Sequence, residues 1–187
     1  MFHAGWSRYA RAMDMRIFLG HGASGNAKSM APFVDGLARR DHRATAIDLP
    51  RRRAEDALPA FHAVVPNAPD VVVGGHSFGG RVASLAAAEP AAAYAALILF
   101  SYPLHAPGAP DRAEARTAHW PLIRCPVLLL SGESDPFARI ELLRRLVAQL
   151  PNAELVTYPK LGHTLRPVLD DALDRAAAFL DRIAAAA

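Results

Sequence analysis

Residues 71–80 read Val-Val-Val-Gly-Gly-His-Ser-Phe-Gly-Gly, and this stretch decides the fold of the chain. Three β-branched apolar residues run into glycines, and a histidine, a serine and a phenylalanine precede two further glycines. The segment that follows, 81–88, is rich in alanine, which favours a helix. The pattern therefore predicts a buried strand that ends sharply at Ser77 and turns directly into a helix.

Residues 75–79 match the G-x-S-x-G pattern, in which a strained turn presents a serine hydroxyl at the carboxyl edge of a sheet. The glycines two residues before and after the serine are needed because a Cβ at either place would collide with a neighbouring strand or helix. Two other interpretations stay open. The turn could simply pack closely against its neighbours, or its N–H groups could bind phosphate.

The length of 187 residues predicts a single domain, which we assign to residues 15–187. Residues 1–14 are interpreted as an N-terminal extension, either disordered or the product of a start codon placed too early. They lack the apolar core of a signal peptide, and no apolar run in the chain approaches the length of a membrane span. We therefore expect a cytoplasmic protein that does not bind membranes.

The charge pattern argues against nucleic-acid binding. The formal net charge is only +3, and the arginines are scattered rather than gathered in a basic stripe with interleaved aromatic residues. Cys125 is the single cysteine, so no internal disulfide can form. We expect it to be a buried, inert thiol at the start of an apolar strand.

Strands and helices alternate along the chain. The apolar patterns predict strands at 16–19, 45–49, 71–73, 97–100, 125–130 and 154–158. They predict helices from a cap at Ser29 to residue 37, at 54–64, 78–89 and 137–150, and through 168–183. The fold class is therefore α/β, with three layers: a doubly wound, mainly parallel sheet of about six strands, covered by helices on both faces.

In such a sheet the carboxyl ends of all strands lie at one edge, where ligand chemistry takes place. A serine nucleophile there needs a histidine base, and the histidine needs an acid that holds its tautomer. Asp135 follows the fifth predicted strand and His163 follows the sixth. The chain order Ser77, Asp135, His163 thus supplies a candidate catalytic triad.

Each member of this triad also has a simpler interpretation. Asp135 precedes a proline, as many helix caps do, and Glu133 is a second candidate for the acid. His163 could be a surface-loop residue, although it is the only one of eight histidines that lies in the loop after the last strand.

The tetrahedral intermediate of acyl transfer also needs two N–H donors for its oxyanion. Phe78, which follows the serine, should provide one of them. Ala23, in the glycine-rich loop 20–26 after the first strand, should provide the other. This loop could instead form a phosphate-binding nest, but it lacks the lysine of a nucleotide-binding loop.

The chain resembles the α/β-hydrolase superfamily from Ile17 to its C-terminus. Four motifs resemble more narrowly the small dienelactone-hydrolase-like branch, which includes the KANL3/Tex30-type hydrolase-like domains. These motifs are His-Gly-Ala at 21–23, Asp-Leu-Pro at 48–50, Gly-His-Ser-Phe-Gly-Gly-Arg at 75–81 and Cys-Pro-Val-Leu at 125–128. Dienelactone hydrolases themselves use a cysteine nucleophile, where this chain has Ser77.

The resemblance implies a minimal α/β-hydrolase fold with strand order 2-1-3-4-5-6. The segment 101–120 is too short for a cap domain, so the site is not expected to enclose a large apolar substrate. The resemblance further implies a serine hydrolase that cleaves a small ester or thioester through an acyl-enzyme, without a metal or other cofactor. Its expected partner is that small-molecule substrate; oligomeric state is left open.

Several residues near the predicted edge are candidates for substrate binding: His21, Gly22, Arg51, His76, Tyr102 and Leu104. Arg51 opens an arginine triplet that could attract an anionic substrate, or that could be a solvated basic loop. Tyr102 and Leu104 could wall the pocket or only pack within their loop. Two alternatives to hydrolysis remain: a non-catalytic binding or scaffold protein, and a phosphate- or nucleotide-binding protein.

Overall fold

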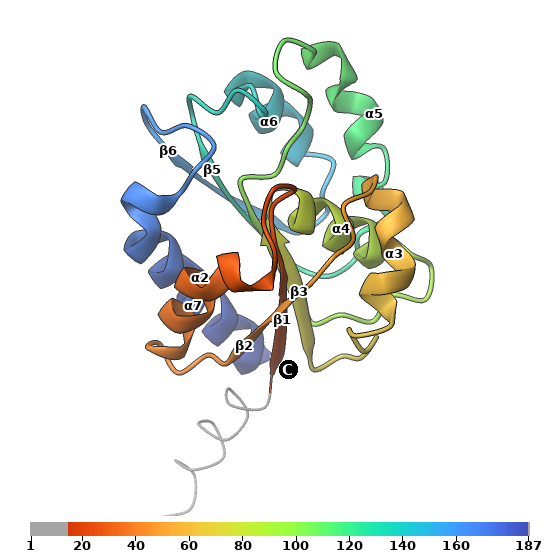
Figure 1. Ribbon diagram of the computed structural model, residues 1–187, viewed down its shortest axis with the longest axis vertical. Coiled ribbons are helices and arrows are strands. Elements are labelled where there is room, and N and C mark those ends of the chain that lie inside the picture. Colours follow the sequence, from red (N-terminus) through yellow and green to blue (C-terminus); the bar gives the residue numbers. More distant parts are fainter. Residues whose placement is uncertain (1–14, 187) are drawn as a thin grey trace, which may run out of the picture.

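The computed structural model describes residues 15–186 (Figure 1), so the predicted extension at 1–14 lies outside the described residues. Its strands are β1 (Arg16–Gly20), β2 (Ala44–Ile47), β3 (Val71–His76), β4 (Ala96–Phe100), β5 (Val127–Gly132) and β6 (Ala153–Tyr158). Its α-helices are α2 (Ala31–Ala38), α3 (Ala54–His62), α4 (Phe78–Ala87), α5 (Ala113–Thr117), α6 (Ile140–Val147) and α7 (Leu169–Ala186). Short 3₁₀ turns occupy Ala27–Met30, Pro110–Arg112, Trp120–Leu122 and Arg166–Val168.

The six strands form one parallel sheet in the order β2-β1-β3-β4-β5-β6, which confirms the predicted order. The inner strands β3 and β4 are covered on both faces. From Val71 to Gly75, and throughout β4, every residue is buried. This explains why these strands read as continuous apolar runs rather than as an alternating pattern.

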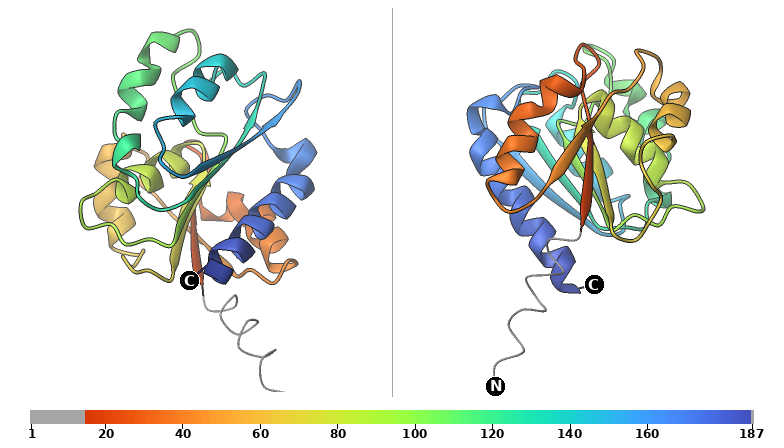
Figure 2. Two further views of the ribbon diagram at one scale, coloured as in Figure 1. Left: turned by 180° about the vertical axis from the view of Figure 1, so that it is seen from behind. Right: turned by 60° about the horizontal axis from the view of Figure 1, so that its bottom comes forward.

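Helices cover both faces of the sheet, as the views in Figure 2 show, so the three-layer prediction is confirmed. Side chains alternate between the two faces along β3. Val72 packs with residues of α2 and α7, such as Leu37 and Leu173. Val71 and Val73 belong to the opposite core, which α3, α4 and α6 complete with side chains such as Val82.

Several element boundaries differ from the sequence prediction. The first helix begins as a 3₁₀ turn whose cap is Asn26, and the hydroxyl of Ser29 accepts from the Asn26 N–H and donates to its carbonyl. Strand β5 begins at Val127 rather than Cys125. The fourth predicted helix begins at Ile140 rather than 137, because residues 135–138 form a turn closed by the Asp135 carbonyl and the Ala138 N–H.

The connection between β4 and β5 holds only α5 and two 3₁₀ turns within the described chain, so no cap domain covers the sheet edge. Helix α5 was not predicted, because no helix was expected between the strands at 97–100 and 125–130. Among the helices of residues 15–186, none is both long and apolar enough to cross a membrane.

Candidate active site

Ser77 sits at the sharp turn between β3 and α4. Its φ of 51° and ψ of −110° are rare for a non-glycine residue and cost on the order of 1–3 kcal/mol. The Ser77 N–H donates to the Phe100 carbonyl at 2.9 Å, so the residue still belongs to the sheet, while α4 begins at the next residue. The turn thereby holds the serine side chain at the carboxyl edge of β3.

Two glycines allow the backbones around this turn to approach closely. A Cβ on Gly75, whose φ is +154°, or on Gly79 would overlap the backbone of Gly20 at the end of β1. The Gly79 N–H also donates to the His21 carbonyl at 2.9 Å. The start of α4 is therefore fixed against the loop that follows β1.

A chain of hydrogen bonds joins the three residues predicted to form the triad. The Ser77 Oγ lies 2.9 Å from Nε2 of His163, and Nδ1 of His163 lies 2.7 Å from Oδ2 of Asp135. The imidazole that fits both contacts carries its proton on Nδ1, donates to the carboxylate and accepts the serine hydroxyl proton. The structure thus brings together side chains that are separated by up to 86 residues.

The Asp135 side chain is fully buried and has both oxygens engaged. Its Oδ1 accepts from the Phe137 N–H at 2.8 Å, which fixes the carboxylate while Oδ2 faces the histidine. The capping interpretation of Asp135 is thus partly correct, since one oxygen does hold the following turn. The second candidate acid, Glu133, points elsewhere and accepts from Arg144 and Thr157.

Two aromatic rings lie close to the imidazole of His163. The Phe137 ring centroid lies 4.5 Å from that of His163, and the His76 centroid lies 5.3 Å away. Nε2 of His76 is 3.4 Å from the His163 carbonyl, to which it donates. Burial, and then the nearby His163, lower the pKa of His76, so His76 is a neutral donor that positions the His163 loop.

Two backbone N–H groups are available near the serine. Within residues 15–186, neither the Ala23 nor the Phe78 N–H donates to a protein acceptor, and both residues line the same cavity as Ser77. The Ala23 loop is braced by buried His21, whose Nδ1–H donates to the Gly22 carbonyl and whose Nε2 accepts from the Leu49 N–H. His21 therefore supports the loop and does not line the cavity.

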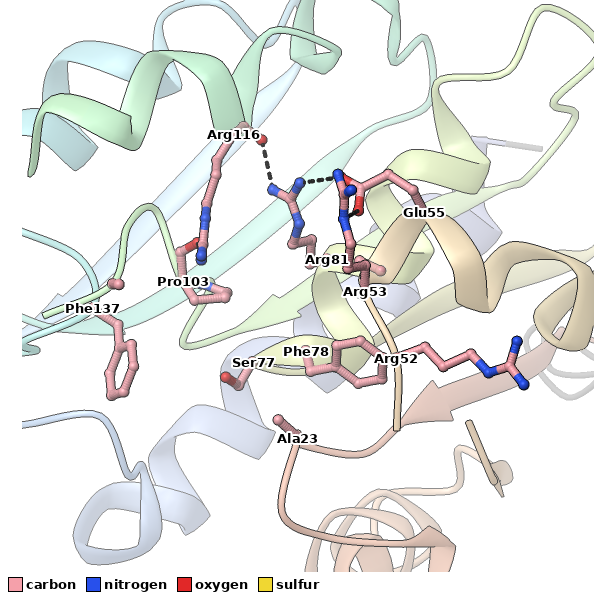
Figure 3. A pocket seen from close by; sticks show the side chains of 12 residues that line it. Ala23, Arg52, Arg53, Glu55, Ser77, Phe78, Arg81, Pro103, Arg116 and Phe137 are labelled. Carbon is pink, nitrogen blue, oxygen red and sulfur yellow. Dashed lines mark hydrogen bonds and ion pairs between the residues drawn. The ribbon is translucent and has the colours of Figure 1, made fainter. Parts of the chain in front are cut away.

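A cavity of about 420 Å³ opens beside Ser77 (Figure 3). Its walls come from the loops after β1, β2, β4 and β5 and from α3, α4 and α5. The lining residues are Ala23, Arg52, Arg53, Ala54, Glu55, Ser77, Phe78, Arg81, Pro103, Ala106, Arg116 and Phe137.

All six residues predicted to bind substrate lie outside this lining. Arg51 is exposed and lies outside the lining, whereas Arg52 and Arg53 of the same triplet line the cavity. Tyr102 and Leu104 are buried behind the wall, and the Tyr102 hydroxyl donates to the Arg116 carbonyl. Gly22 and His76 lie against each other next to Ser77, but neither lines the cavity.

Three charged residues of the cavity were not predicted from the sequence: Glu55, Arg81 and Arg116. Arg81 could have been found, because it stands one helical turn after Ser77 on α4 and so lies on the same side of the helix. Glu55 lies in the first turn of α3, which follows the arginine triplet. No sequence pattern could have placed Arg116 in the cavity, because it belongs to α5, whose position depends on tertiary packing.

Neither metal-binding nor thiol chemistry has support in the described residues. Across residues 15–186, no three His, Cys, Asp or Glu side chains are grouped so as to hold a metal ion. Burial raises the pKa of Cys125 to about 11, which keeps this thiol protonated and unreactive.

Several solved structures with a fold similar to that of this chain are described as hydrolytic enzymes, each at low sequence identity. A monoacylglycerol lipase of Paleococcus ferrophilus has a TM-score of 0.76 at 16% identity, and the match covers 90% of this chain and 94% of that one. An esterase of Pyrococcus furiosus has a TM-score of 0.71 at 18% identity, covering 90% and 81%. The thioesterase domain of a curacin biosynthetic pathway has a TM-score of 0.70 at 16% identity, covering 90% and 91%.

These structural likenesses show a shared fold. No curated protein matches the sequence. A family model described as an alpha/beta hydrolase domain matches residues 13–186, which is nearly the whole chain. The match includes the serine turn and the loops that carry the acid and the histidine. The chain therefore belongs to the α/β hydrolase domain family.

Proposed function

We propose that the protein is a serine hydrolase that cleaves a small ester or thioester through an acyl-enzyme. The observation that carries this proposal is the hydrogen-bond chain from the Ser77 hydroxyl through His163 to buried Asp135. Two free N–H groups and a cavity stand beside it. These are the parts that acyl transfer to a serine requires.

In the proposed reaction, Nε2 of His163 takes the hydroxyl proton as the Ser77 Oγ attacks the carbonyl carbon. The negative charge that develops on the carbonyl oxygen is stabilised by the N–H groups of Ala23 and Phe78. The imidazolium of His163, stabilised by Asp135, then gives its proton to the leaving alcohol or thiol, which leaves an acyl group on Ser77. Water, deprotonated by the same imidazole, hydrolyses this acyl-enzyme.

The size and openness of the site support a small substrate. The cavity holds about 420 Å³, and within residues 15–186 no cap domain closes over it. It lies at the low end of the volumes typical of small-molecule sites. The similar solved structures include an esterase and a thioesterase domain, which agrees with either bond type here.

A hydrolysis assay tests the proposal. We expect the purified protein to cleave p-nitrophenyl butyrate, and Ser77→Ala to lower kcat by at least about a thousandfold. Ser134→Ala removes an exposed serine hydroxyl near the acid loop and serves as the control, which should retain the wild-type rate. Equal rates for wild type and Ser77→Ala would reject the proposal in favour of a non-catalytic binding or scaffold role.

Two finer assignments are part of the same proposal. We place the chain in the small dienelactone-hydrolase-like branch because of the His-Gly-Ala loop at 21–23 and the motif at 75–81. We also propose a cytoplasmic protein that binds neither nucleic acid nor membranes. The single cysteine and the scattered arginines support this assignment, and cell fractionation with a tagged protein tests the location.

A further inference from the structure

The cavity beside Ser77 is strongly basic. Four arginines line it, namely Arg52, Arg53, Arg81 and Arg116, against the single carboxylate of Glu55. A net positive wall of this kind attracts anions, and the proposed hydrolysis of an uncharged ester does not require it. The question is which of these guanidinium groups is free to bind an anion inside the cavity.

Two of the four arginines share the one carboxylate. Nη2 of Arg81 lies 2.6 Å from Glu55 Oε1, and its Nη1 donates to the Arg116 carbonyl at 3.1 Å. Nε of Arg53 lies 3.7 Å from the other oxygen of Glu55. Arg52 is exposed and its side chain points away from Ser77 in Figure 3. None of these three is a free donor facing the nucleophile.

Arg116 is different. Its side chain runs from α5 toward Pro103 on the side of the cavity where Ser77 lies (Figure 3), and it is half-buried. Its Nη1 donates to the Pro103 carbonyl at a long 3.3 Å, and no carboxylate of the described residues lies within 4 Å. Burial, followed by the positive charge of Arg81, lowers the pKa of Arg116, so its charge is poorly compensated.

An anion that enters the cavity would relieve this charge. A guanidinium presents its donors as a planar fork that matches the two oxygens of a carboxylate. With Nη1 engaged by the Pro103 carbonyl at 3.3 Å, the remaining N–H donors of Arg116 match one carboxylate, whereas a doubly charged phosphate would call for more donors. The apolar side chains of Pro103 and Phe137, also in the lining, flank the space near Ser77 and suit a short aliphatic chain.

We propose that Arg116 binds a carboxylate of the substrate, so that this protein prefers esters or thioesters that carry a carboxylate near the scissile bond. The preference in hydrolysis rests on the proposed function. The binding of a carboxylate at Arg116 does not, because it requires no reaction at Ser77.

The first test compares charged and uncharged substrates of matched size. p-Nitrophenyl hemiglutarate carries a carboxylate on the acyl chain, and p-nitrophenyl pentanoate is its uncharged counterpart. A second pair, p-nitrophenyl acetate and its ring-carboxylated derivative, places the charge on the leaving group. We expect kcat/KM of the wild type to favour the charged member of at least one pair, with spontaneous hydrolysis subtracted.

Substitution of Arg116 should remove this preference. We expect Arg116→Gln to lower the charged-to-uncharged ratio of kcat/KM about tenfold or more, mainly through KM, and Arg116→Lys to keep part of it. Arg112→Gln is the matched control, because Arg112 stands on the same segment but is exposed, near Asp111 and outside the lining. Its ratio should equal that of the wild type. A ratio independent of Arg116 in both pairs would overturn the inference.

A binding measurement separates this inference from the proposed function. Titration calorimetry with glutarate on the Ser77→Ala protein needs no turnover. We expect glutarate to bind, to bind more weakly at 0.5 M NaCl, and to lose affinity about tenfold when Arg116→Gln is added. Glutarate binding that depends on Arg116 supports the inference even if no ester is cleaved. Binding that is absent, or unchanged in the double variant, contradicts it.

Discussion

At the scale of single residues, Ser77 holds a backbone conformation that only its surroundings make stable. The Phe100 carbonyl accepts from its N–H, and the close contact between Gly20 and Gly79 leaves no room for the turn to relax. The result is a hydroxyl that faces the His163 imidazole at 2.9 Å before any substrate arrives. Such preorganisation is what makes a serine nucleophile effective.

The role of Asp135 can be tested by one substitution. Asp135→Asn keeps the shape of the side chain but removes the charge that, in the proposed mechanism, stabilises the imidazolium, and it can hold His163 in the wrong tautomer. We expect kcat for p-nitrophenyl butyrate to fall by about a hundredfold to ten-thousandfold.

Glu133→Gln is the control for this prediction, because Glu133 stands two residues away and contacts Arg144 and Thr157 instead of the histidine. Its kcat should stay within about threefold of the wild type, as expected of a change outside the site. A larger loss of kcat in Glu133→Gln than in Asp135→Asn would show that Asp135 is not the acid of the site.

At the scale of elements, the approach of α4 to β1 positions both Ser77, the proposed nucleophile, and the Ala23 loop. Gly79→Ala places a methyl group into the Gly20 backbone, which no side-chain rotation can relieve. We expect the free energy of unfolding to fall by more than about 3 kcal/mol, measured by urea denaturation.

Gly162→Ala is the comparison for the α4 substitution. No atom lies within 4 Å of a Cβ at Gly162, so its stability should change by less than about 1 kcal/mol. Similar stabilities of the Gly79→Ala and Gly162→Ala proteins would show that the contact between α4 and β1 is not close in solution.

Sequence analysis could predict the parts of these elements that depend on local pattern. Buried strands such as β3 can be recognised in the sequence as short apolar runs. Because parallel strands end at one edge of the sheet, the loops with Ser77, Asp135 and His163 could be expected to meet there. The position of the first helix was predicted correctly, but its capping residue was not. The cap is Asn26, and Ser29 stands at the third position of the 3₁₀ turn, where its hydroxyl accepts from the Asn26 N–H.

The cavity wall could not be predicted in the same way. Arg116 enters it from α5, a five-residue helix between prolines, whose position is set by contacts such as that of Tyr102 with the Arg116 carbonyl. Tyr102 itself lies directly after β4, which made it a natural candidate for the pocket, yet its ring packs inward against Trp120. Only the path of the chain in space decides which loop residues reach the cavity.

At the scale of the whole molecule, a half-buried histidine links stability to pH. Nε2 of His119 lies 2.8 Å from the Ser84 hydroxyl on α4, and Arg81 and Glu55 are the charged groups that act on it. Burial, and then Arg81, lower the pKa of His119 to about 4. In the unfolded chain this pKa returns to about 6.5.

The sign of the effect follows from these values. Below pH 6.5, His119 binds a proton in the unfolded chain but stays neutral in the folded protein. The free energy of unfolding is therefore highest above pH 6.5 and falls as the pH drops toward 4. We expect the contribution of His119 to be about 1–2 kcal/mol after allowance for its partial exposure.

Urea denaturation at pH 7 and pH 4.5 measures this difference. His119→Gln keeps a partner for the Ser84 hydroxyl but cannot take up a proton, so its stability should fall less over the same range. A fall as steep as that of the wild type would show that other groups are responsible.

The most direct measurement of the central claim is covalent labelling of the native protein with a fluorophosphonate, which reacts with serines that an adjacent histidine activates. We predict one adduct per chain by intact mass, located on the peptide that contains Ser77, with none in Ser77→Ala or in heat-denatured protein. In His163→Ala the rate of labelling should fall by at least about a hundredfold. A native protein that remains unlabelled, or that is labelled equally in the Ser77→Ala variant, would contradict the account.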